Sequence, residues 1–250
     1  MSGDDAIVRL RASAKLTLSL RVVGLRADGY HLIDAEMVTL DLADELSIDA
    51  SAPSSLIVSG PFAAGVPTGD SNLVSQAMRL VARRGAVHLD KRIPSGGGLG
   101  GGSADAAAIL RWAGVTDPAV AVRLGADIPF CVAGGRARVT GIGEQIEQLP
   151  AVTRVVTLVV PPVHVSTPAV YRAWDDLGGP TALGANDLEA AALVVEPGLV
   201  TWRDRIAELT GAAPVLAGSG ATWFLDGDHA DALAALERDG AAVIVSRTTP

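Results

Sequence analysis

The stretch "KRIPSGGGLGGGSADAAAIL", residues 91–110, has six glycines and one leucine between Ser95 and Ser103, and then runs into alanine-rich sequence. Glycine loses more conformational freedom on folding than any other residue, so we expect such a run only where the backbone must approach something closely. The run exposes consecutive backbone N–H groups. A helix predicted from about Ser103 adds its unpaired amides and the positive end of its dipole. The stretch therefore predicts a phosphate-binding loop.

Two familiar phosphate motifs fit this loop poorly. A Walker P-loop needs a lysine directly after its last glycine, and none stands there. A dinucleotide fingerprint is formally present at Gly96, Gly98 and Gly101. However, the preceding strand alternates and ends at Pro94, whereas a Rossmann strand is a continuous apolar run. A nucleoside-triphosphate loop of another kind is favoured; a dinucleotide-dependent oxidoreductase and a loop without a ligand are the alternatives.

The composition excludes several classes of protein. The 250 residues are 49% hydrophobic and 19% charged, which is typical of a globular chain. A net charge of −8, spread along the sequence, disfavours non-specific binding to nucleic acid or to a membrane surface. The single cysteine, Cys131, excludes an intramolecular disulfide, and "PFCVAG" predicts that it lies in a buried strand. With no signal-peptide pattern and no long apolar stretch, we expect a soluble, cytoplasmic protein.

Lysine is rare in this chain. Of the twenty basic residues only Lys15 and Lys91 are lysines. Lys15 interrupts a strand of apolar and small residues, and Lys91 stands at the mouth of the glycine run. Because lysine is a compact point charge and arginine a planar fork, a site can require one and not the other. The pattern favours a functional Lys15; for Lys91, a functional cation and a solvated surface residue both stay open.

Up to about residue 150 the sequence predicts strands with interspersed helices. Residues 7–22 alternate, with Leu16, Leu18 and Leu20 on one face, which indicates a half-buried strand. A turn is expected over 24–31. Further strands, mostly alternating and so antiparallel, are predicted over 36–49 and 54–60, and a short strand over 86–94. Helices are predicted over 71–85, from about 103, and over 117–127.

After residue 150 a second unit begins with a buried strand. Its strands are predicted over 153–162, on both sides of a turn within 215–225, and over 241–247; its helices over 166–174, 185–193, 198–209 and 229–240. The fold class is therefore α+β, with mixed, mostly antiparallel sheets and helices in two domains, residues 1–150 and 151–250.

Five segments together resemble the GHMP kinase superfamily, and the resemblance covers most of the chain. They are "ASAKLTLSLRVVGLRADGYHLIDAEMVTLDLAD" (12–44), the glycine stretch (91–110), "LGADIPF" (124–130), "VSTPAVY" (165–171) and "LAGSGATWF" (216–224). "RADGYH" and "LGADIPF" are specific to one branch, which acts on a cytidine-diphosphate sugar alcohol in non-mevalonate isoprenoid biosynthesis. The resemblance implies a two-domain α+β kinase.

The resemblance implies transfer of the γ-phosphate of ATP to the 2-hydroxyl of that sugar alcohol, with Mg²⁺ on the phosphates and Ser103 as a candidate metal ligand. Asp127 falls on the general base and Lys15 on the cation beside it. A carboxylate next to a lysine is expected to stay ionised, so that it can accept the hydroxyl proton. The alternative is a purely structural role, in which Asp127 only caps the turn before Pro129.

The substrate residues implied by the resemblance surround a flat base. Tyr30 and Tyr171 would stack on the two faces of the cytosine and His31 would read its edge, while Thr17 and Thr167 would contact the substrate. Stacking is worth roughly 1–3 kcal/mol per ring. A core position for Tyr171 and a simple N-cap role for Thr167 are the alternatives.

The nucleotide residues implied by the resemblance lie on three segments. They are Asn72, Leu73, Lys91, Pro94, Gly96, Gly97, Gly98, Leu99, Gly100, Gly101, Gly102, Ser103, Gly218, Ser219 and Gly220. Asn72 could instead be a helix cap and nothing more.

Two features depart from the family pattern. Thr17 stands where the family usually has asparagine, and an asparagine offers an amide donor that threonine lacks. The connection before Leu124 is short, so the substrate or the activity could be altered.

Three other functions remain open at this stage. One is a GHMP kinase for homoserine, mevalonate or a sugar, and another is a degenerate, non-catalytic member that binds a ligand. The oxidoreductase is the third. The expected partners are a small-molecule substrate and ATP, without nucleic acid or membrane, in a monomer or weak homodimer.

Overall fold

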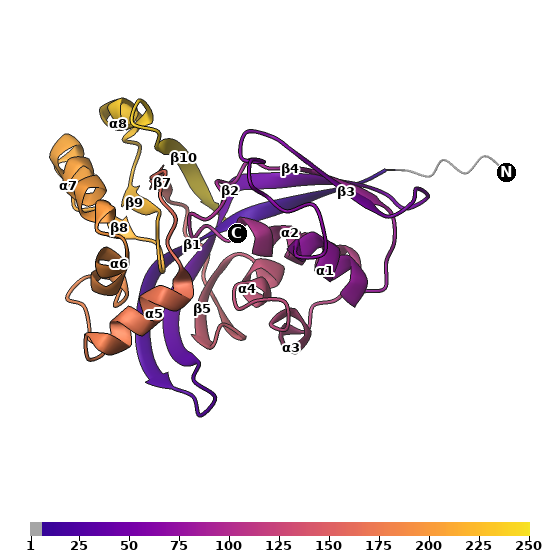
Figure 1. Ribbon diagram of the computed structural model, residues 1–250, viewed down its shortest axis with the longest axis horizontal. Helices are drawn as coiled ribbons and strands as arrows, with labels where there is room; N and C mark the ends of the chain where they lie inside the picture. The colour runs from indigo at the N-terminus through magenta and orange to yellow at the C-terminus, as the bar shows by residue number, and fades with distance from the viewer. Residues whose placement is uncertain (1–6) are drawn as a thin grey trace.

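The computed structural model describes residues 7–250 as an α+β fold with one mixed sheet and helices on either side of it (Figure 1). The strands are β1 Val8–Leu25, β2 His31–Asp49, β3 Ser55–Ser59, β4 Ala86–Asp90, β5 Arg136–Gly141, β6 Gln145–Leu149, β7 Val155–Val160, β8 Val215–Leu216, β9 Trp223–Asp226 and β10 Ala242–Thr249. The helices are α1 Leu73–Leu80, α2 Gly101–Trp112, α3 Pro118–Ala121, α4 Ile128–Ala133, α5 Thr167–Asp176, α6 Glu189–Val195, α7 Gly198–Thr210 and α8 Ala230–Glu237.

The long strand β2 organises the sheet. It pairs antiparallel with β1 along one edge, and its other edge meets β5, β10 and β4 in turn. β10 also pairs with β7, which continues to β9 and β8. Figure 1 shows α1–α4 beside the β1–β4 end and α5–α8 beside β7–β10. The division into residues 1–150 and 151–250 stays a prediction.

Most predicted elements are confirmed, but several predictions differ from the structure. β3 and β4 pair parallel, whereas the alternation favoured antiparallel strands. The hairpin β5–β6 was not predicted. α2 begins at Gly101 rather than Ser103, because Gly100 takes the left-handed conformation at the cap and the two following glycines enter the helix.

The prediction that Cys131 lies in a strand is wrong. It lies in the short helix α4, whose first turn contains Pro129. Proline is tolerated there because the first N–H groups of a helix have no partner within the helix. Cys131 is buried, and burial raises the pKa of its thiol to about 12, so the thiol stays protonated.

The prediction that β1 is half-buried is also wrong in its central part. Leu16 and Leu18 pack in a cluster with Leu99, but Lys15 and Thr17 on the other face are buried as well. The pairing with β2 shifts register on both sides of this segment, between Ser13 and Lys15 and between Thr17 and Ser19. Such irregularities bend a strand and re-aim its side chains. The second face is therefore turned into the protein rather than to solvent.

The glycine loop packs very closely against two other segments of the chain. Gly98 has a φ of +77°, and a Cβ there would lie 2.7 Å from the Gly220 carbonyl oxygen. Gly100 has a φ of +69°, and its Cβ would lie 2.8 Å from Lys15 Cγ. The Lys15 N–H donates to the Leu99 carbonyl at 3.0 Å. The loop thus lies between β1 and the C-terminal glycine segment, with no room for a side chain at Gly98 or Gly100.

The backbone of the same loop also has the form of an anion site. Gly96, Gly98 and Gly100, every second residue, have positive φ. Alternation of this kind is typical of nests, which turn successive N–H groups toward one concave side. Close packing and amide presentation therefore both require glycine here.

Lys91 anchors the start of the glycine loop through buried ion pairs. Only 3% of Lys91 is exposed, so the surface alternative for this lysine is wrong. Its Nζ donates to Asp44 on β2 and to Asp105 Oδ2 on α2, the latter at 2.8 Å. Asp44 Oδ1 also accepts the N–H groups of Arg92 and Ile93. One ammonium therefore ties β2, the end of β4 and α2 together.

Two carboxylates share that single ammonium, and Asp105 is the less well satisfied of the two. Its Oδ1 is buried without a hydrogen-bond partner among the described residues. Burial, opposed by Lys91 and reinforced by Asp44, raises the pKa of Asp105 to about 7.

None of the described helices is long and apolar enough to cross a membrane.

We expect Gly98→Ala to destabilise the fold by about 2 kcal/mol or more, because a positive φ and a backbone clash act together. The matched control is Gly102→Ala, where the new Cβ would meet Leu73 Cδ1 at 3.5 Å, an ordinary contact, within a helix. That control should be neutral or stabilising by up to about 1 kcal/mol. Urea unfolding measures both; equal effects would contradict the packing described for the loop.

We expect the stability of the wild type relative to Asp105→Asn to fall as pH rises from about 4 to about 7. The raised pKa means that the folded state favours the protonated acid, so the stabilisation present at low pH is lost as pH rises through the folded pKa. Asp44→Asn should instead destabilise throughout this range, by about 1–3 kcal/mol, because Asp44 accepts charge-assisted bonds from Lys91, Arg92 and Ile93. Urea unfolding from pH 4 to 8 provides the comparison. A difference in the free energy of unfolding between Asp105→Asn and the wild type that does not change with pH would contradict the prediction.

Candidate active site

Lys15 and Asp127 face each other in one cavity of about 570 Å³. Lys15 Nζ lies 3.4 Å from Asp127 Oδ2. The ammonium is buried, whereas 36% of the Asp127 side chain is exposed. The carboxylate therefore has one side on a fixed cation and the other open to a ligand.

Strand β1 and the glycine loop together fix Lys15. Its backbone N–H bonds to the loop at Leu99, and its Nζ donates to Thr17 Oγ1 at 3.1 Å. Thr17 lines the cavity but is buried, and its hydroxyl holds the lysine. A direct contact between Thr17 and a substrate stays a prediction.

Asp127 stands immediately before α4, but its side chain makes no capping hydrogen bond. Only its backbone carbonyl serves the helix, by accepting the N–H of Cys131 at 3.1 Å. The alternative that Asp127 merely caps the turn before Pro129 is therefore wrong. Its carboxylate is free to act on what enters the cavity.

The turn between β1 and β2 brings Tyr30 to the rim of this cavity. The Arg26 guanidinium bonds the Asp28 carboxylate at 2.8 and 2.7 Å, and its Cζ lies 5.4 Å from the centre of the Tyr30 ring. The Tyr30 ring itself is largely exposed. The turn thus presents an aromatic face to solvent at the entrance.

One face of α5 forms the opposite wall. Thr167, Tyr171, Trp174 and Asp175 recur at helical spacing and so share that face. The His31 ring stacks on Tyr171, with centroids 4.7 Å apart and planes at 25°. Burial, with the charge of Asp127, raises the pKa of Tyr171 to about 12, so its phenol stays protonated. Tyr30, His31 and Tyr171 line one cavity, as expected; the stacking of a base between the tyrosines stays a prediction.

The C-terminal glycine segment closes the cavity from the side of β8 and β9. Thr167 Oγ1 and Ser219 Oγ are hydrogen-bonded at 2.7 Å. Gly218, Ser219 and Ser103 line this larger cavity, although all three were predicted to bind the nucleotide. Gly220 lines neither this cavity nor the cavity along the glycine loop. Its carbonyl oxygen lies against Gly98.

A second cavity, of about 270 Å³, follows the glycine loop. The predicted nucleotide residues that line it are Asn72, Leu73, Lys91, Pro94, Gly96, Gly97, Gly98, Leu99, Gly100, Gly101 and Gly102. Gly98 lines both cavities, so the loop cavity and the Lys15–Asp127 cavity adjoin. A group bound on the loop would lie next to the lysine and the carboxylate.

Asn72 works as a helix cap in this structure. Its Oδ1 accepts the N–H of Val74 at 2.8 Å, and its Nδ2 donates to the Pro67 carbonyl at 2.7 Å. Both ends of the amide are therefore used, and a contact with a nucleotide stays a prediction.

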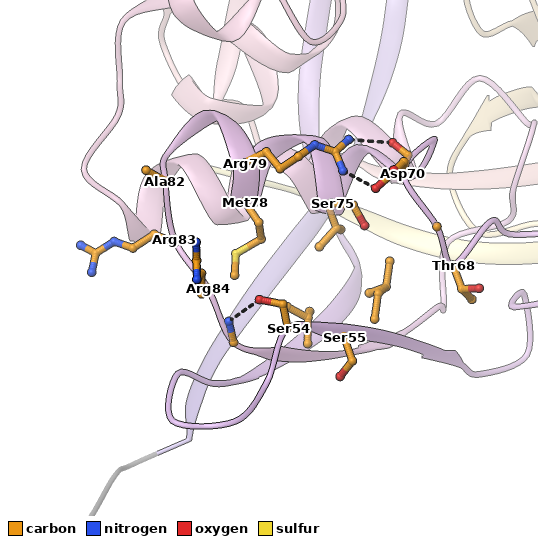
Figure 2. Close-up of a pocket in the computed structure, with 15 residues that line it drawn as sticks. Ser54, Ser55, Thr68, Asp70, Ser75, Met78, Arg79, Ala82, Arg83 and Arg84 are labelled. Carbon is orange, nitrogen blue, oxygen red and sulfur yellow. Dashed lines mark hydrogen bonds and ion pairs between the residues drawn. The ribbon is translucent and has the colours of Figure 1, made fainter.

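Figure 2 shows a third cavity, of about 540 Å³, between β3 and α1. Arg79 pairs there with Asp70, and Arg83 and Arg84 stand at its edge. None of the predicted site residues lines it. It lies apart from the residues that carry the chemistry.

The sequence prediction missed four charged residues. Arg172 and Asp175 line the larger cavity, and Asp44 and Asp105 hold Lys91. Asp175 stands one helical turn after Tyr171, and this spacing could have placed it on the same face. Asp44 lies 47 residues from Lys91 and Asp105 lies 14 residues from it, and no local pattern indicates that either acid pairs with the lysine.

Comparison with known proteins gives a consistent result. Residues 72–135 match the model of the GHMP kinases N terminal domain. The 4-diphosphocytidyl-2-C-methyl-D-erythritol kinase of Paracoccus denitrificans is 42% identical, over 92% of this chain and 91% of the relative. That of Paramagnetospirillum magneticum is 39% identical, over 93% and 94%.

Solved structures agree. A crystal structure of 4-(cytidine 5'-diphospho)-2C-methyl-D-erythritol kinase superposes with a TM-score of 0.78 at 30% identity, covering 97% of this chain and all of that one. A homoserine kinase from Cytophaga hutchinsonii has a TM-score of 0.60 at 16% identity, covering 100% and 96%, and shows the shared fold alone. The predicted α+β kinase fold is confirmed, and the chain belongs to the GHMP kinases and, within them, to the 4-diphosphocytidyl-2-C-methyl-D-erythritol kinase family.

Proposed function

We propose that this ATP-dependent kinase transfers the γ-phosphate of ATP to the 2-hydroxyl of 4-diphosphocytidyl-2-C-methyl-D-erythritol, a step of non-mevalonate isoprenoid biosynthesis. The observation that carries the proposal is the Lys15–Asp127 pair, 3.4 Å apart, in a cavity that adjoins the glycine loop at Gly98. The names of the relatives supply the substrate.

The reaction places few demands on the protein beyond position and charge. As the hydroxyl oxygen bonds to the γ-phosphorus, its proton passes to the Asp127 carboxylate and the bond to ADP breaks. Lys15 Nζ, 3.4 Å from Asp127 Oδ2, orients the carboxylate and stabilises the negative charge that builds between hydroxyl and phosphate. Because Asp127 is one-third exposed and Lys15 is buried, only the carboxylate has free room for the hydroxyl.

The far end of the cavity suits a cytidine diphosphate. Tyr30, His31 and Tyr171 offer flat surfaces and a ring nitrogen for a base. Arg172 lines the same cavity and can pair with diphosphate oxygens, for which a guanidinium fork is well shaped. This aromatic group favours the cytidine substrate over homoserine, mevalonate or a simple sugar, none of which has a base to stack.

Mg²⁺ fits this site as an ion held mainly by the nucleotide. Among residues 7–250 no group of three or more His, Cys, Asp or Glu is placed to hold a metal. Mg²⁺ keeps several waters and needs few protein ligands, so the Ser103 hydroxyl on the cavity wall would suffice with the ATP phosphates. The ion would neutralise phosphate charge.

Three further expectations stay predictions. They are the cytoplasmic location, the monomeric or weakly dimeric state, and an effect of Thr17 or of the short connection before Leu124 on substrate or activity.

Incubation with Mg-ATP and 4-diphosphocytidyl-2-C-methyl-D-erythritol should give ADP and a product heavier by one phosphoryl group, detected by mass spectrometry. Asp127→Asn should lower kcat by about 10²–10⁴-fold, because the general base is lost while the shape of the site is kept.

The control is Asp117→Asn, since Asp117 caps α3 and asparagine caps equally well. It should retain wild-type kcat. Full activity of Asp127→Asn would remove the base from the mechanism. Absence of a phosphorylated product with the wild type would leave the non-catalytic binder as the better reading.

A further inference from the structure

Asp175 holds His31 by one short hydrogen bond. His31 Nε2 and Asp175 Oδ1 lie 2.8 Å apart, and only 11% of the histidine side chain is exposed. Tyr171 stacks on the ring, and Trp174 meets it edge-on at 5.7 Å with planes at 87°. Three residues of α5 thus fix the position of a side chain that belongs to β2.

In the neutral form of His31, this contact decides which of the two ring nitrogens carries the proton. An ionised carboxylate can only accept hydrogen bonds, so Nε2 must donate to Asp175. In a neutral imidazole the other nitrogen, Nδ1, is then an unprotonated acceptor. Nδ1 has no hydrogen-bond partner among residues 7–250, and it is not enclosed by protein. A neutral His31 therefore offers an acceptor at the wall of the larger cavity.

We propose that Asp175 is a positioning residue that fixes His31 as a hydrogen-bond acceptor, so that the site selects a base with an exocyclic amine, cytosine, over one with a keto group, uracil. The inference rests on the proposed function in taking the ligand to be a pyrimidine nucleotide. The 4-amino group of cytosine can donate a hydrogen bond to Nδ1. The 4-oxo group of uracil is an acceptor, so its lone pair and that of Nδ1 would repel each other.

The ring geometry supports edge-on contact. Hydrogen bonds to an imidazole nitrogen lie in the ring plane. Because the His31 and Tyr171 planes differ by only 25°, a base bonded in the plane of His31 would lie nearly parallel to Tyr171. The orientation of the two rings is therefore compatible with an edge contact between His31 and a base.

The test compares CDP and UDP as probes, by calorimetric titration of the wild type, Asp175→Ala and Asp175→Asn. The wild type should bind CDP at least about tenfold more tightly than UDP, the ratio expected when one acceptor is either paired with a donor or opposed by another acceptor in the bound state. Asp175→Ala and Asp175→Asn should each lower that ratio at least about fivefold, since alanine cannot hold the tautomer and asparagine can donate as well as accept. The control is Asp176→Asn, at the next, exposed residue of α5, which should leave the ratio unchanged.

A spectroscopic readout separates positioning from a merely structural role. Long-range ¹⁵N–¹H correlation spectra distinguish the two neutral tautomers from the imidazolium, and the chain has only four histidines to assign. His31 should show the Nε2–H tautomer in the wild type and a mixture in Asp175→Ala. A wild type with the Nδ1–H tautomer or the imidazolium at the pH of the titration overturns the inference.

The two proposals fail separately. A chain that phosphorylates its substrate but keeps the same CDP-to-UDP ratio in the Asp175 variants loses this inference and keeps the proposed function. A chain without kinase activity that prefers CDP, with a preference that depends on Asp175, keeps this inference and loses the proposed function. A wild type that binds CDP and UDP equally overturns the inference outright.

Discussion

The contact between the glycine loop and β1 at Lys15 is the constraint on which the rest of the site depends. The Lys15 N–H bonds the Leu99 carbonyl, and Gly100 leaves no space above the lysine stem for even one added carbon. The loop that presents amides to an anion is thus packed on the residue that supplies the cation. On its other side Gly98 touches the C-terminal glycine segment, so both ends of the chain set the shape of the loop. A change in any of these three segments would shift the loop that presents the amides and the cation together.

Both lysines of this arginine-rich chain are buried in the site, and their partners explain their different roles. Lys91 has two carboxylates and almost no exposure, so its charge is used to hold β2, β4 and α2 together. Lys15 has one hydroxyl and one carboxylate, and that carboxylate is open to the cavity. Because a buried charge is tolerated only when it is paired, the number of partners decides which lysine can still act on a ligand.

The sequence was sufficient to predict the parts of the site that depend on local pattern. The glycine loop and the capped helix after Asn72 could be recognised because backbone chemistry requires those residue types in that order. The segment around Asp127 was recognised only by its resemblance to the GHMP kinases. The sequence could not predict pairings between distant segments. Nothing near Lys91 indicates that Asp44 and Asp105 would surround it, and alternation along β1 gave no sign that its polar face would be covered. The aromatic residues were predicted to hold a base, but the bond from His31 to Asp175 depends on how α5 lies against β2, which only the folded chain defines. Cys131 was misplaced because "PFCV" is apolar in either a strand or a helix, and Pro129 at the start of a helix decided between them.

The central claim is that Lys15 and Asp127 act on the hydroxyl as one unit. A double-mutant cycle in kcat/KM for the phosphorylation reaction, with Lys15→Met, Asp127→Asn and the double variant, tests it most directly. The account predicts that the double variant is about as slow as the slower single variant, because each substitution already disables the pair. If the two losses multiplied, the residues would act independently, and the account of this site would be wrong.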